Sequence, residues 1–205
     1  MIGIIDYGSG NVGAIINIFK QYRIPHLLSG DPSELQDAER YILPGVGAFD
    51  PTMGQLRAIG LIDFLDDQVR QKKKNILGIC VGMQLLAESS EEGSLPGLGY
   101  ISGSVRKIPE NTLNAPPKLP HLGWNSISFA KECPLLEGVD PEIGYYFLHS
   151  YYFDPAHSDD VLATTTFGRE ITCAVWRENV YGVQFHPEKS HANGVRLLRN
   201  FATMT

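Results

Sequence analysis

Residues 75–87 constrain the fold more than any other part of the chain. A short apolar run leads into Cys80, with Gly78 two residues before it and Gly82 two residues after it, and a helical pattern follows without a polar linker. Such glycines suit a strained strand-to-helix turn that presents one side chain. The first amides of a helix would also favour the thiolate of Cys80. A buried cysteine beside packing glycines remains the alternative for this segment alone.

The first half of the chain alternates between short apolar runs and segments with helical spacing, such as Ile15 and Phe19. We predict strands at 2–6, 26–29, 41–43 and 76–79, the third ended by Pro44, and helices at 11–21 and 51–73, the latter broken near Gly60. Strands separated by helices require right-handed crossovers and therefore a parallel sheet covered on both faces. Ligands bind such sheets beyond the carboxyl ends of the strands, where Tyr7, Pro44 and Cys80 follow.

The second half of the chain has a different pattern. Residues 95–114 are rich in glycine, serine and proline, and short segments of β type come after them. The predicted strands are 103–108, 124–129, 145–153, 161–167, 172–176 and 181–185, and a last helix at 192–202 has Val195, Leu198 and Phe201 on one face. We therefore predict one domain, 1–205, with a three-layer, flavodoxin-like α/β fold and a mostly parallel mixed sheet.

Composition excludes several classes of function. The net charge of −6 and the pI near 5.5 argue against a nucleic-acid or anionic-membrane partner, because those partners usually require a basic face. The three cysteines, Cys80, Cys133 and Cys173, form no C-x-x-C pair, which indicates reduced thiols without a disulfide or zinc. We also expect no signal peptide and no membrane span, since no apolar run reaches about 18 residues. The expected location is the cytoplasm.

A glycine motif at residues 8–13 offers a competing function. Gly8, Gly10 and Gly13 form G-x-G-x-x-G after a predicted strand, and Asp31 lies where a dinucleotide-binding protein would bind a ribose hydroxyl. Asp31 also stands between Gly30 and a proline, which is equally typical of a turn. The motif could therefore be a tight turn into the first helix, a dinucleotide site, or a loop that contributes to another site.

The loop at residues 44–47 is the second glycine-rich element. Gly45 and Gly47, with Val46 between them, would let the backbone turn its N–H groups toward a reacting centre without hindrance from side chains. In a parallel sheet the third strand can lie beside the fourth, which would bring these donors near Cys80. A plain turn explains an isolated Gly-x-Gly equally well.

His186 and Glu188 near the end of the chain supply a base and an acid. A predicted strand carries His186 to its tip, and Pro187 keeps the following backbone extended. Glu188 could then bind one imidazole nitrogen and leave the other to face a nucleophile. On its own the pair could be an ordinary surface pair. Together with Cys80 it forms the Cys-His-acid set of nucleophilic acyl transfer.

The segments around Cys80, loop 44–47 and His186 together resemble the class I (triad-type) glutamine amidotransferase family over essentially the whole chain. Within that family, residues 6–11, 121–125 and 146–151 are similar to the glutaminase subunits of imidazole glycerol phosphate synthases. Members of that group carry the opening glycine loop and bind no dinucleotide. The resemblance therefore disfavours the dinucleotide-binding interpretation and implies no cofactor and no metal.

The resemblance implies a role for each matching residue. Cys80 would attack the side-chain amide of glutamine, and His186, oriented by Glu188, would transfer the protons. The oxyanion would be held by backbone N–H groups of Gly45, Val46, Gly47 and Val81. Five residues would bind the substrate, Gln84 and Glu92 at its α-amino end and His149, Ser150 and Tyr151 near its α-carboxylate.

The resemblance also implies a partner, because the sequence contains no evident acceptor site for ammonia. A (βα)8-barrel synthase would receive the ammonia through a channel and form imidazole glycerol phosphate and AICAR in histidine biosynthesis. The segments 145–153 and 11–15 differ somewhat from the commonest pattern of that pathway. A paralogous subunit that feeds ammonia to a sugar amidotransferase in surface-polysaccharide synthesis is therefore the alternative, and a dinucleotide-binding module is a remote one.

Overall fold

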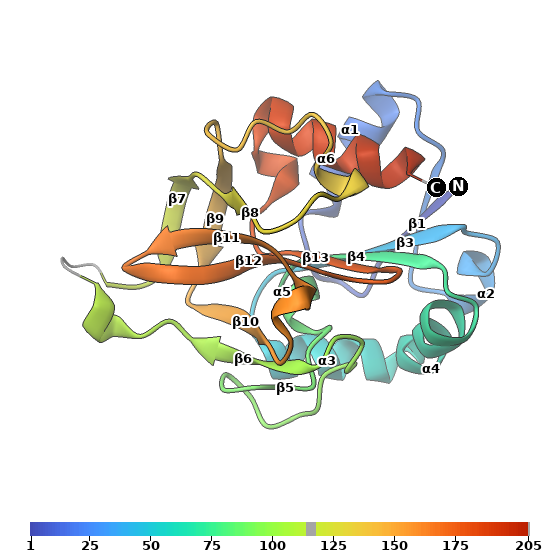
Figure 1. Ribbon diagram of the computed structural model, residues 1–205. Helices are drawn as coiled ribbons and strands as arrows, with labels where there is room; N and C mark the ends of the chain where they lie inside the picture. Colours follow the sequence, from blue (N-terminus) through green and yellow to red (C-terminus); the bar gives the residue numbers. More distant parts are fainter. Residues whose placement is uncertain (114–117, 205) are drawn as a thin grey trace.

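The computed structural model describes residues 1–113 and 118–204, and its largest element is an eight-stranded sheet in the order β2-β1-β3-β4-β13-β12-β11-β8 (Figure 1). The first five strands in this order pair in parallel, and the last three pair antiparallel. The strands are β1 Ile2–Ile5, β2 His26–Ser29, β3 Arg40–Gly45, β4 Asn75–Cys80, β8 Ser128–Phe129, β11 Val161–Phe167, β12 Arg169–Arg177 and β13 Val180–Val183. The predicted mixed sheet is present.

Helices cover both faces of this sheet. Figure 1 shows α1 and α6 on one face and α3 and α4 on the other. Gly60, with φ +73°, separates α3 from α4, as predicted. The helices are α1 Val12–Gln21, α2 Pro32–Leu35, α3 Phe49–Ala58, α4 Leu61–Leu65, α5 Val81–Gln84 and α6 His191–Thr203, with a π-helix at Asp66–Gln71 and 3-10 turns at Glu110–Thr112, Pro134–Leu136, Ser158–Asp160 and Pro187–Lys189. In α6, Leu197 is buried and Val195 is only half-buried, so the apolar face differs slightly from the predicted one.

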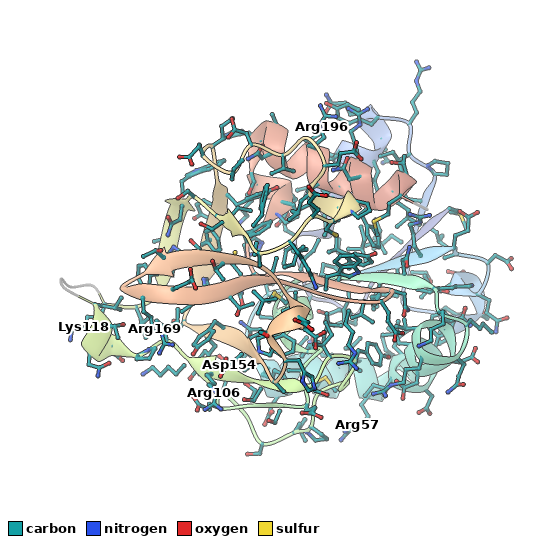
Figure 2. The ribbon with its side chains drawn as sticks, viewed as in Figure 1. Arg57, Arg106, Lys118, Asp154, Arg169 and Arg196 are labelled. Carbon is teal, nitrogen blue, oxygen red and sulfur yellow. The ribbon has the colours of Figure 1, made fainter. Side chains whose placement is uncertain are left out.

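Two small sheets flank the large one. They are β10-β6-β5, formed by Tyr151–Pro155, Gly103–Lys107 and Ser89–Ser90, and β7-β9, formed by His121–Asn125 and Tyr145–His149. Arg106 and Asp154 form an exposed ion pair between β6 and β10, with 2.7 Å between Nε and Oδ2 (Figure 2). The prediction of one continuous strand at 124–129 and another at 145–153 is wrong. Each segment divides into two strands that pair in different sheets. Asn114, where the predicted loop region ended, lies outside the described residues.

Two other predicted boundaries differ from the structure. Strand β3 continues through Pro44 to Gly45, although we expected Pro44 to end it. β1 pairs with β3 only as far as Ile42, so a residue without an N–H is tolerated beyond that point. The helix after Cys80 covers Val81–Gln84, although the helical pattern in the sequence continues to Ala87. The carbonyls of Leu85 and Ala87 accept hydrogen bonds from residues 98 and 99, which ends α5 after four residues.

Gly82 sits where the turn after β4 meets the backbone of β3. A Cβ atom at this position would lie 1.8 Å from the carbonyl oxygen of Leu43. We expect Gly82→Ala to lower the free energy of unfolding by roughly 3 kcal/mol, because backbone would have to move. Urea denaturation measures the change.

Gly54→Ala is the matched control, because Gly54 is a helical glycine with no atom within 4 Å of its would-be Cβ. Alanine there should be neutral or stabilise the protein by about 0.5–1 kcal/mol. Equal destabilisation by the two substitutions would contradict the close backbone contact at Gly82.

Candidate active site

Three neighbouring strands bring the predicted catalytic residues to one edge of the sheet. β4 lies between β3 and β13 in the strand order. Cys80 ends β4, loop 44–47 ends β3, and His186 follows β13 by three residues. Because these strands are parallel, their carboxyl ends meet at the same edge. The fold thus joins segments more than a hundred residues apart in the sequence.

Cys80 occupies a strained turn between β4 and α5. Its φ of +56° and ψ of −115° lie in a region that residues with a side chain rarely adopt. The turn depends on its glycines, since a Cβ at Gly78 would lie 2.5 Å from the carbonyl oxygen of Gly82, and one at Gly45 would lie 2.6 Å from the Gly82 nitrogen. The geometry is that of the predicted nucleophile turn, and it leaves Cys80 5% exposed.

His186 and Glu188 form a buried pair beside Cys80. The Nδ1 atom of His186 lies 2.9 Å from Oε1 of Glu188, and the two side chains are 4% and 1% exposed. Burial lowers the pKa of His186, but the neighbouring Cys80 and Glu188 side chains outweigh this effect and raise that pKa well above its ordinary value. The carboxylate uses Nδ1, so Nε2 is the nitrogen left for proton transfer.

The glycine motif 8–13 packs against loop 44–47. The N–H of Val46 donates to Oγ of Ser9 at 3.0 Å, and the Ser9 hydroxyl donates to the Val46 carbonyl at 2.7 Å. The hydroxyl of Tyr7 donates to the Pro44 carbonyl, and a Cβ at Gly10 would lie 2.7 Å from Cβ of Pro44. The motif therefore supports the neighbouring loop. In this arrangement the Val46 N–H is bound to Ser9.

Asp31 has a structural role of its own. Its carboxylate accepts the N–H of Ser33 at 2.8 Å and caps the short helix α2. It also accepts the Ser33 hydroxyl at 2.8 Å. Both features of the dinucleotide interpretation, the glycines and the acid, thus have partners within the fold. Nothing in this geometry favours a nucleotide site.

A cavity of about 300 Å³ lies between these elements. Most of the predicted site residues line it: Val46, Gly47, Cys80, Val81, Gln84, Glu92, His149, Ser150, Tyr151 and His186. Gly45 and Glu188 do not line it, since Gly45 pairs with Cys80 inside the sheet and Glu188 lies behind His186. Two lining residues, Pro120 and Leu148, were not predicted. Leu148 is 41% exposed within a largely apolar strand, a pattern that gives no sign of a site.

Glu92 and His149 are held in place by hydrogen bonds. Oε2 of Glu92 accepts the N–H of Phe49 at 2.9 Å, at the start of α3. Nδ1 of His149 lies 2.7 Å from the Tyr151 carbonyl, and its Nε2 lies 3.0 Å from Nδ1 of His121. Since a carbonyl only accepts, His149 donates from Nδ1 and accepts at Nε2. Burial lowers the pKa of His121 to about 4 and that of His149 to about 3.

Within residues 1–113 and 118–204 there is no group of three or more His, Cys, Asp or Glu side chains that could hold a metal ion. Over the same residues, no helix has both the length and the apolar character needed to cross a membrane.

The model of the family described as glutamine amidotransferase class-I matches residues 4–204. The chain belongs to this family. The family resemblance seen in the sequence is confirmed, and with it the prediction of an enzyme of this class. The chain is 48% identical to imidazole glycerol phosphate synthase subunit HisH of Leptospira borgpetersenii, over the full length of both chains. It is 44% identical to subunit HisH 2 of Pseudomonas aeruginosa, also over the full length of both.

Solved structures support the fold. A structure described as a glutamine amidotransferase has a TM-score of 0.73 at 20% identity, covering 98% of this chain and 96% of the other. PurLQS from Thermotoga maritima also has a TM-score of 0.73, at 18% identity, with the same two coverages. The predicted mixed α/β fold is confirmed by these similarities.

The two neutral histidines predict a loss of stability in acid. Unfolding returns His121 and His149 to pKa values near 6.5, so below that pH the unfolded chain binds protons that the folded chain does not. The free energy of unfolding should therefore fall as the pH drops from about 6.5 toward 4, by up to about 1.4 kcal/mol per pH unit for each histidine. Urea denaturation at several pH values measures the slope.

His121→Phe tests the assignment, because the ring of His121 stacks between Phe147 and Phe167 at 4.6 and 4.3 Å. Phenylalanine keeps an aromatic ring there and removes one titrating group. The acid slope should become shallower. An unchanged slope would mean that His121 does not contribute to it.

Proposed function

We propose that this chain is the glutaminase subunit of an imidazole glycerol phosphate synthase in histidine biosynthesis, acting as a single domain that hydrolyses glutamine to glutamate and ammonia. The observation that carries the proposal is the cavity in which Cys80, in its strained turn, lies with His186 and the buried Glu188 behind it. The reaction class follows from this set of groups. The names of the full-length relatives support the pathway.

The first half of the reaction forms a thioester. Sγ of Cys80 attacks the carboxamide carbon of glutamine, and His186 takes the thiol proton at Nε2. A C–S bond forms and the carbonyl oxygen becomes an oxyanion. His186 then gives its proton to the amide nitrogen, the C–N bond breaks, and ammonia leaves. Glu188 stabilises the protonated imidazole through Nδ1.

The second half of the reaction restores the enzyme. His186 removes a proton from water, and the hydroxyl oxygen attacks the thioester carbon. The C–S bond breaks as glutamate forms, and Cys80 recovers its proton from His186. No redox step or cofactor is needed, because the thiol proton leaves with ammonia and a proton taken from water restores the Cys80 thiol.

The oxyanion requires backbone donors beside Cys80. We assign this role to the N–H groups of Val81 and of loop 44–47, with Gly45, Val46 and Gly47 as candidates. Val46 can contribute only after the hydrogen bond between its N–H and Ser9 breaks. For the substrate, we assign Gln84 and Glu92 to the α-amino group and His149, Ser150 and Tyr151 to the wall near the α-carboxylate.

Cys80→Ala should abolish glutamate release, because Cys80 is the thiol that lines the cavity and forms the thioester. The assay measures glutamate from the purified chain, alone and with candidate partner subunits. Cys133→Ala is the matched control, since Cys133 is also a buried cysteine but lies outside the cavity. Glutamate release that survives Cys80→Ala at the wild-type rate would refute the proposed chemistry.

A partner is expected to consume the ammonia. Three exposed apolar side chains, Leu122, Trp124 and Leu148, are 61%, 45% and 41% exposed on the two-stranded sheet β7-β9. Leu122 and Leu148 face each other across the strands, and Leu148 lines the cavity. An apolar surface at the mouth of a site is typical of an interaction surface. We propose that it binds a (βα)8-barrel synthase subunit, with a sugar amidotransferase as the alternative partner.

Leu122→Asp should weaken the complex with the (βα)8-barrel synthase subunit about tenfold or more, because a charge would be buried against the partner. Co-purification and the partner-stimulated rate of glutamate release measure the effect. Tyr22→Asp is the control, since Tyr22 is similarly exposed but ends α1 at the opposite edge of the sheet. Equal binding by the two variants would argue against this surface, and binding of the wild type only to a sugar amidotransferase would favour the alternative.

A further inference from the structure

Gln184 is a buried polar residue between the nucleophile and the substrate-binding wall. It follows β13 directly and is 0% exposed. Its Nε2 lies 3.7 Å from Sγ of Cys80, and its Oε1 lies 2.9 Å from Nε2 of Gln84. We propose, on the basis of the glutaminase function above, that Gln184 is a positioning residue that holds the sulfur of Cys80 and fixes the orientation of the Gln84 amide.

The orientation of both amides follows from one backbone carbonyl. The Tyr151 oxygen can only accept hydrogen bonds, so the Gln84 atom 3.1 Å from it must be the amide nitrogen Nε2. Nε2 of Gln84 donates its second hydrogen toward Gln184, so the Gln184 atom there must be the oxygen Oε1. The amide group of Gln184 must then turn its N–H toward Sγ of Cys80. No choice of orientation is left free.

The same carbonyl is held from a second side. Nδ1 of His149 donates to the Tyr151 oxygen at 2.7 Å, and His149 in turn accepts from His121. The carbonyl therefore receives two donors, from Gln84 and from His149, and both of these residues line the cavity. Because this carbonyl is held in place, it determines the orientation of the Gln84 amide and, through it, of the Gln184 amide.

For Cys80 the consequence is a donor that faces the sulfur. The strained backbone sets where the Cβ lies, but the side chain could still rotate about its Cα–Cβ bond. An N–H donor favours one position of the sulfur and stabilises a thiolate there, the form that attacks carbon.

For Gln84 the consequence is that its amide can present only its oxygen to a ligand. Both hydrogens of its Nε2 are used, by Tyr151 and by Gln184. Only its carbonyl oxygen remains for a ligand, and Gln84 lines the cavity. An acceptor at this position suits an ammonium group, which agrees with its proposed place at the α-amino end of glutamine. A free amide could instead present its nitrogen, which would oppose that group.

The test is Gln184→Met, which keeps an unbranched side chain and removes both hydrogen bonds. Two readouts are measured: the rate at which iodoacetamide alkylates Cys80, followed on its peptide by mass spectrometry, and kcat and KM for glutamine with the partner present. We expect alkylation and kcat to fall at least tenfold, since a hydrogen bond to a charged group contributes about 1.5–3 kcal/mol, and we expect KM to rise. Values of all three within twofold of wild type would overturn the proposal.

Gln68→Met is the matched control. Gln68 is 1% exposed and also hydrogen-bonded through its amide, to the Tyr41 hydroxyl at 3.1 Å, but it does not line the cavity. It should lose stability without a change in Cys80 alkylation. If both variants slow alkylation equally, the effect is a general loss of packing, and the proposal is overturned.

Gln184→Glu gives a second test that does not depend on Gln184→Met folding. Its carboxyl group can still accept from Gln84, but once ionised it places an oxygen without a hydrogen against the sulfur. Alkylation of Cys80 should then slow, relative to wild type, as the pH rises through the ionisation of this group. Equal alkylation rates for Gln184→Glu and the wild type at every pH from 6 to 9 would contradict the role of the N–H donor. Because alkylation needs no glutamine, these results stand apart from the Cys80→Ala assay of the glutaminase function.

Discussion

The close contact between the backbone of β3 and the turn after β4 is the constraint on which the site depends. At Gly45, Gly78 and Gly82 the chain leaves no room for a Cβ, and the carbonyl of Leu43 lies directly against Gly82. Two backbone segments can approach this closely only where no side chains separate them. The contact places loop 44–47 next to Cys80. It also means that Cys80 and the Gly45 end of the loop are positioned by main chain, the least adjustable part of the fold.

The cavity contains histidines of two kinds. His186 has a carboxylate against Nδ1 and a raised pKa, whereas the ring nitrogens of His149 meet a carbonyl and His121, and its pKa is lowered, mainly by burial. Burial acts on both histidines in the same direction, so the neighbouring charge decides the difference. Glu188 therefore favours the protonated imidazole at the residue that we assign to proton transfer. The neutral pair, His121 and His149, instead helps to hold the Tyr151 carbonyl in place.

The local parts of this structure and the pairing of β3 with β4 could be predicted from the sequence, whereas several other long-range contacts could not. The alternation of strands and helices and the glycines around Cys80 predict a parallel sheet with a strained turn at its edge, and that much is present. The break of segment 145–153 depends on β9 and β10 pairing in different sheets, which side-chain periodicity does not record. The early end of α5 depends on amides at 98–101. Gln184 lies in the predicted strand 181–185, just before His186, yet only the structure gives its partners. The roles assigned to the site residues stay predictions.

The hydrogen bonds between Ser9 and Val46 set how firmly loop 44–47 is held. Val46 is 45% exposed, so water competes for the same groups, and each bond contributes on the order of 1 kcal/mol. A molecule that competes for these two groups therefore needs a preference of only about 2 kcal/mol to displace them. The N–H of Val46 is held by exchangeable side-chain hydrogen bonds, whereas Cys80 is fixed by backbone packed against backbone.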